Sequence, residues 1–120
     1  MKISEKKTIE KYTIYAGLND KDTNEQKYIT DRVTALITGI SNGYKSPLTC
    51  QTGSGTYFSE MGTQVNENSL VITLVDTSEE LVNEIAADIC AFLNQETVMI
   101  TVEKIERYFL QETIAVRGDE

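Results

Sequence analysis

Thirteen residues, "CQTGSGTYFSEMG", place Gly53-Ser54-Gly55 ahead of two aromatic residues and could bind a phosphate or a base. A phosphate-binding loop needs more glycines, a following helix whose amides face the anion, and usually a lysine. None of these follows Gly55, so the segment favours a hairpin turn in which glycine supplies positive φ. Tyr57 and Phe58 are adjacent, so on a strand they point to opposite faces and only one can serve a pocket.

A second candidate segment, "FLNQETVM", lies between the end of a predicted helix and the start of a predicted strand. Asn94 and Gln95 each offer a donor and an acceptor that could bind a base or ribose edge. The favoured alternative is an ordinary helix C-terminus in which Asn94 adopts the left-handed conformation.

Arg107 stands next to Tyr108 in "EKIERYFL". Charge on an exposed edge strand would explain it, and so would a site for phosphate or adenine, because guanidinium bonds bidentately and stacks on rings. The residues alone favour neither. Arg32, in the middle of the first predicted helix, and Lys27 are expected at the surface.

Composition excludes several kinds of chemistry. The chain has no histidine, which excludes histidine triads and histidine-bearing zinc motifs. Cys50 and Cys90 are expected to be reduced thiols, and no acidic segment has calcium-loop spacing. A net charge of -8 disfavours polymeric nucleic acid and anionic membranes. We therefore expect a binding protein and not an enzyme, with no catalytic residue, no metal ligand and no cofactor.

The elements that must position these residues follow from hydrophobic periodicity. Alternation predicts a strand over 11–18, and apolar residues at helical spacing predict a helix over 26–40 with a Thr23–Gln26 capping box. Gly39 and Gly43 are its expected stop signals. Two or three strands follow between 46 and 76, with a turn at 66–68. A helix capped by Thr77 and Glu80 and a strand from about 98 to 109 complete the order.

This order predicts a single ferredoxin-like α+β domain over 1–120, with two helices covering one face of an antiparallel sheet. Residues 1–10 and 111–120 are expected to be loosely ordered. The uncovered sheet face would carry Tyr15 and Met99, and self-association is the simplest way to hide them, so we expect a homo-oligomer, a dimer or a multiple of dimers.

Four segments, "YTIYAGLNDKD", "GSGTYFSEMG", "NSLVITLVD" and "FLNQETVMIT", resemble small bacteriophage Thoeris anti-defence proteins of the first type. The likeness covers roughly 12–109 and rests on general pattern. It implies a cytoplasmic protein of the infected bacterium that sequesters a cyclic ADP-ribose isomer without cleaving it, with cyclic oligonucleotides as further possible ligands. An oligomeric protein-binding module without a nucleotide ligand is the alternative.

The resemblance, combined with side-chain chemistry, also implies a ligand-binding set. Arg107 and Arg32 would bind the ligand's phosphates, and Phe58 or Tyr57, with Phe92 and Tyr108, would stack on its adenine ring. Asn94 and Gln95 would hydrogen-bond to its polar edges, and Lys27 is a further cation that could contribute.

Overall fold

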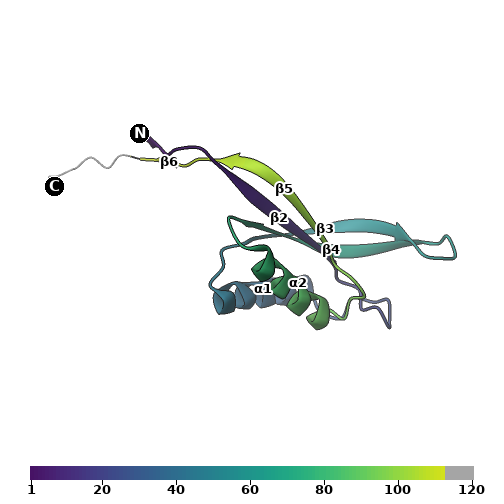
Figure 1. The fold of residues 1–120 in the computed structure, drawn as a ribbon. Coiled ribbons are helices and arrows are strands. Elements are labelled where there is room, and N and C mark those ends of the chain that lie inside the picture. The colour runs from purple at the N-terminus through teal and green to yellow at the C-terminus, as the bar shows by residue number, and fades with distance from the viewer. Residues whose placement is uncertain (113–120) are drawn as a thin grey trace.

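The structure is a computed structural model that describes residues 1–112, and it shows a four-stranded antiparallel sheet with two helices packed on one face (Figure 1). The elements are β1 Lys2–Ile3, β2 Lys7–Gly17, α1 Thr30–Tyr44, β3 Thr49–Phe58, β4 Gln64–Val75, α2 Glu79–Phe92, β5 Met99–Arg107 and β6 Leu110–Gln111. Strand order in the main sheet is β3-β4-β2-β5, and β1 pairs with β6. The predicted ferredoxin-like α+β fold is confirmed.

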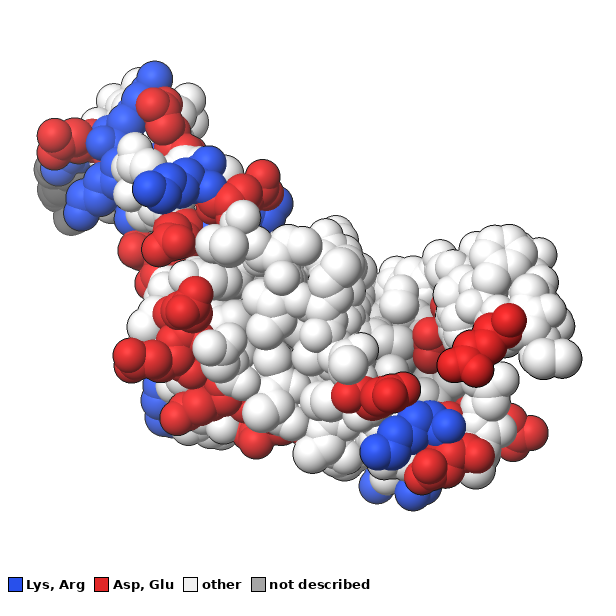
Figure 2. Space-filling view, turned by 45° about the vertical axis from the view of Figure 1, so that its right-hand side comes forward, with Lys and Arg blue, Asp and Glu red and all other residues white. Residues whose placement is uncertain are grey.

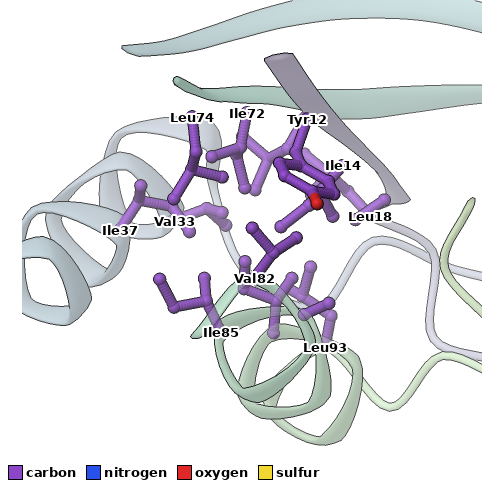
Figure 3. Packing of buried hydrophobic residues seen from close by; sticks show 14 residues of the cluster. Tyr12, Ile14, Leu18, Val33, Ile37, Ile72, Leu74, Val82, Ile85 and Leu93 are labelled. Carbon is purple, nitrogen blue, oxygen red and sulfur yellow. The ribbon is translucent and has the colours of Figure 1, made fainter. Parts of the chain in front are cut away.

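The core lies between the sheet and the helices, where alternate residues of the two central strands meet apolar stripes of α1 and α2 (Figure 3). The main contributors are Tyr12, Ile14 and Ala16 of β2, Leu70, Ile72 and Leu74 of β4, Val33 and Ile37 of α1, and Val82, Ile85 and Ile89 of α2. Burying each large side chain contributes about 1.5–3 kcal/mol, so this layer is what holds the helices on the sheet.

Both helices begin at residues other than those predicted. α1 begins at Thr30, after an Ile29 N-cap that makes no side-chain cap bond, and the Thr23 hydroxyl accepts instead from the Glu25 amide at 3.3 Å. The predicted stops at Gly39 and Gly43 are also wrong, because α1 continues to Tyr44 and ends on a left-handed Lys45. In α2 the cap is Ser78, whose Oγ accepts from the Leu81 amide at 3.2 Å, one residue after the predicted Thr77.

Two predicted turns lie inside long strands. β3 runs unbroken through Gly53-Ser54-Gly55, and β4 runs through 66–68 opposite it, with Gly53 paired to Ser69 and Gly55 to Glu67. The continuous ladder outweighs local turn propensity, so the hairpin turn predicted at these glycines is wrong, and the disfavoured phosphate cradle does not form there either. The turn itself lies at 59–63, where Gly62 has φ of +80°.

The molecule is long, 66 × 29 × 25 Å, because strands project beyond the helices at both ends (Figure 1). We call residues 53–69 the hairpin arm. The start of β2, the end of β5 and the β1–β6 pair form the terminal arm.

The sequence predicts that residues 1–10 are loosely ordered, whereas in the structure they include β1 and the start of β2, and Ile9 is buried. Of the 111–120 segment, residues 113–120 lie outside the described part. Within residues 1–112, no helix combines the length and apolarity needed to cross a membrane.

Candidate functional site

A pocket of about 670 Å³ lies where the hairpin arm meets the β2–α1 loop (18–29) and the α2–β5 loop (93–98). We call it the corner pocket. Residues of all three segments and of the end of β2 line it, among them Tyr15, Gly17, Asn19, Tyr57, Glu67 and Gln95. Its size is in the range of sites for small molecules and nucleotides.

Hydrogen bonds fasten the hairpin arm to the β2–α1 loop. The Tyr57 hydroxyl donates to Asn24 Oδ1 at 3.0 Å, and Asn68 Nδ2 donates to Gln26 Oε1 at 2.8 Å. The Leu18 amide also donates to the Asn68 carbonyl at 2.9 Å. The pocket wall is therefore tied to the body of the protein and does not depend on the hairpin alone.

Asp20 fixes the two loops to each other. It is only 8% exposed, and its Oδ1 accepts from the Asp22 amide at 2.8 Å, from the Thr23 amide at 3.3 Å and from Asn94 Nδ2 at 3.0 Å. The bond from the Asp22 amide, followed by that from Asn94, holds the pKa of the Asp20 carboxyl below its ordinary value. Asn94 has φ of 50°, the left-handed conformation that the sequence favoured.

The charge of the corner pocket is negative. Asp20, Glu67 and Glu96 line it, with Lys21 as its one lysine, and no arginine of residues 1–112 takes part. Glu67 Oε2 accepts from the Asn19 amide at 2.9 Å. Acidic side chains also border the recess between the hairpin arm and the body in Figure 2. A pocket with this charge favours a cationic group and disfavours a phosphate.

Three of the nine residues predicted to bind a ligand come together here. Tyr57 and Gln95 line the corner pocket. Asn94 lies beside it, and its side-chain amide donates hydrogen bonds to Asp20 and Asp22. The Gln95 amide group donates to the Asn19 carbonyl, so both amide side chains have structural partners.

A second group of predicted residues lies near the start of α1 and the end of α2. The rings of Tyr28 and Phe92 stack with centroids 4.8 Å apart. Lys27 Nζ lies 5.6 Å and the Arg32 guanidinium 6.0 Å from the Tyr28 ring. Phe92, Arg32 and Lys27 are thus neighbours, and we call this group the aromatic–cation cluster.

Arg107 and Tyr108 lie on the terminal arm, away from both groups. Arg107 pairs with Lys7, ten residues before Gly17 on β2, which at about 3.3 Å per residue is about 33 Å from the pocket end of that strand. Its Nη2 contacts Asp76 Oδ2 at 2.9 Å, and its guanidinium lies 4.5 Å from the Phe109 ring. Tyr108 packs under Lys6. Phe58, 69% exposed, lies next to Tyr57 in the sequence but does not line the corner pocket.

Sequence analysis missed Glu67 and Asp20. The turn predicted at 66–68 contains Glu67, although Val65, Glu67, Ser69 and Val71 alternate and would share one face of a continuous strand. Reading "QVNENSLVITLV" as a single strand is the signal that would have put Glu67 on the open face. No motif in the sequence singles out Asp20, because its contact with Asn94 joins two loops 74 residues apart.

No family model and no curated protein matches the chain. In fold it is similar to a phage SAM lyase in complex with S-methyl-5'-thioadenosine, with a TM-score of 0.63 and 20% identity over 88% of this chain and 92% of that chain. It is also similar to the B. subtilis GlnK–ATP complex, with a TM-score of 0.52 and 14% identity over 82% of each chain. At these identities the likeness establishes the α+β fold. Neither structure is a Thoeris protein, so the cyclic ADP-ribose ligand stays a prediction.

Proposed function

We propose that this chain is a phage anti-defence protein that binds a small adenosine-containing molecule in the corner pocket, a sulfonium nucleoside of the S-adenosylmethionine class. The Glu67 carboxylate in an acidic pocket is the observation that carries the proposal. Two structures of similar fold are described with S-methyl-5'-thioadenosine and with ATP, which share adenosine, and one of them is a phage protein. The resemblance to phage anti-defence proteins supports the same biological setting.

Electrostatics favour the sulfonium over a pyrophosphate. A carboxylate about 4 Å from a single positive charge attracts it by about 1 kcal/mol in bulk water and by about 4 kcal/mol at the effective dielectric of a protein surface. The same carboxylates repel the two phosphates of a cyclic ADP-ribose isomer. Tyr15 and Tyr57, in the same pocket, supply apolar surface for an adenine ring.

Calorimetry with S-adenosylmethionine and S-adenosylhomocysteine tests the proposal, because the two ligands differ by the methyl group that makes the sulfur cationic. We expect S-adenosylmethionine to bind about tenfold or more tightly, since an interaction with a charged group contributes about 1.5–3 kcal/mol. Glu67→Gln should abolish this preference. Glu60→Gln, which removes the same charge from the exposed hairpin turn, should keep it. Equal affinity for both ligands in the unmodified protein would contradict the proposal.

Sequestration of a cyclic ADP-ribose isomer is the second candidate, and the aromatic–cation cluster favours it. Stacked Tyr28 and Phe92 beside Lys27 and Arg32 offer a ring plane and two positive charges. Titration with cyclic ADP-ribose isomers tests this candidate. It predicts binding that Arg32→Gln weakens and Glu67→Gln leaves unchanged, and absence of binding rejects it.

We also propose that the ligand is held and not cleaved. The chain has no histidine, the most common general base, and Asp20 Oδ1 and Glu67 Oε2 both accept hydrogen bonds from the protein. Mass spectrometry after incubation with S-adenosylmethionine should recover the ligand intact. Accumulation of S-methyl-5'-thioadenosine above a protein-free control would instead make the chain a lyase.

A further inference from the structure

We infer that Gly17 is a positioning residue, whose lack of a side chain allows the Glu67 carboxylate to reach across the end of β2 into the corner pocket. The effect of Gly17 on ligand binding rests on the proposed function. The geometry on which it depends involves the protein alone.

Gly17 is the last residue of β2 and pairs with Ser69 of β4. Glu67 precedes Ser69 by two residues, so its side chain lies on the same face of the sheet. Beyond Gly17 the Leu18 amide still donates to the Asn68 carbonyl at 2.9 Å, and the Asn19 amide then donates to Glu67 Oε2, also at 2.9 Å. The carboxylate therefore folds back over the strand end.

A side chain at position 17 would occupy the space that the carboxylate fills. A Cβ built on Gly17 lies 2.4 Å from Glu67 Oε2 and 2.5 Å from both Cδ and Oε1. These separations are far below van der Waals contact, and every clashing atom belongs to the end of one flexible side chain. Alanine would displace the carboxylate and leave the backbone where it is.

Backbone conformation gives no other reason for this glycine. Among residues 1–112, Gly62 is the one glycine with positive φ, so Gly17 has a backbone that alanine can adopt. Gly53 provides a matched comparison, because it pairs with the same Ser69 from the other side, and its built Cβ meets only Ser69 Oγ at 3.8 Å. The close contact is specific to Gly17.

The test compares Gly17→Ala, Gly53→Ala, Glu67→Gln and the Gly17→Ala/Glu67→Gln double variant. We expect all four to fold, with melting temperatures near that of the unmodified protein. Affinity for S-adenosylmethionine should fall about tenfold or more in Gly17→Ala and in Glu67→Gln, and stay unchanged in Gly53→Ala. It should fall no further in the double variant, because the two changes remove the same interaction. Additive losses, or unchanged affinity in Gly17→Ala, would overturn the inference.

A ligand-free measurement separates this inference from the proposed function. The amide resonance of Asn19 in a ¹⁵N-correlated spectrum reports the Glu67 hydrogen bond directly, and Glu67→Ala defines its position without the carboxylate. Gly17→Ala should move the resonance in the same direction, and Gly53→Ala should not. If the unmodified protein does not bind S-adenosylmethionine, the proposed function fails while this result still decides the role of Gly17. An Asn19 resonance that Gly17→Ala leaves in place overturns the inference whatever the ligand.

Discussion

At the scale of single residues, the corner pocket depends on groups that are already bonded to one another. Asp20 joins two loops through Asp22, Thr23 and Asn94, and Glu67 is fixed by the Asn19 amide. Such bonds hold polar side chains in place before a ligand arrives, which lowers the entropy cost of binding.

Asp20→Asn should destabilise the protein in a pH-dependent way. The folded-state pKa of Asp20 is lowered, so its stabilising effect is fully present above the unfolded-state pKa of about 4 and is lost as pH falls through the folded-state value. The difference in urea midpoint between the unmodified protein and Asp20→Asn should be largest near neutral pH and shrink in acid. Glu60→Gln is the control. A difference independent of pH would argue against this role for the charge.

Tyr57→Phe should loosen the hairpin arm. It removes the hydroxyl bond to Asn24, and an ordinary hydrogen bond contributes about 0.5–1.5 kcal/mol, with the lower end expected for this partly exposed side chain. Hydrogen exchange of the 53–58 amides should become faster while that of the central strands is unchanged. Tyr15→Phe, on the same face, is the matched control. Equal protection in both variants would contradict the anchoring role.

At the scale of elements, the two helices start differently. α1 has no side-chain cap at Ile29, whereas Ser78 caps α2. The first turn of α2 also carries Glu79 and Glu80, which interact favourably with the helix dipole. α2 is therefore the better-defined helix at its start.

Ser78→Ala should lower the free energy of unfolding by about 1 kcal/mol, because it removes the acceptor for the Leu81 amide. Thr77→Ala should cost less, because Thr77 is not the cap. Chemical denaturation of both variants measures the difference. A larger loss from Thr77→Ala would support the cap predicted from sequence over the one in the structure.

At the scale of the whole molecule, the arms give the chain an extended outline. Its radius of gyration is 18.4 Å, against about 14 Å for a compact domain of this length. Large apolar side chains are exposed on both arms, among them Phe58, Met61, Phe109 and Leu110. Surfaces of this kind are commonly covered by another protein molecule.

We predict that the protein self-associates in solution. Light scattering during size-exclusion chromatography should give a mass that is a multiple of 13.4 kDa. Phe58→Ser combined with Met61→Ser should reduce that mass if the hairpin arm takes part in the contact. A monomeric mass across the concentration range would reject the prediction.

The sequence predicted the fold because core periodicity is local, and it missed Glu67 and Asp20 in the corner pocket because strand pairing and loop contacts are not local. Alternation in 11–18 and the helical spacing of apolar residues over 26–40 identified a central strand and a helix without tertiary information. The partners of Glu67 and Asp20 depend on β4 lying beside β2 and on the two loops meeting. Gly53 and Gly55 show the same effect, because long-range pairing overrides their local turn preference.

The β1–β6 pair brings Lys2 opposite Gln111, so two positions far apart in the sequence are neighbours at one tip of the molecule. A reporter fused at either of the two positions would sit at the opposite end of β2 from Gly17, and the protein could then be immobilised or labelled there without obstructing the other end.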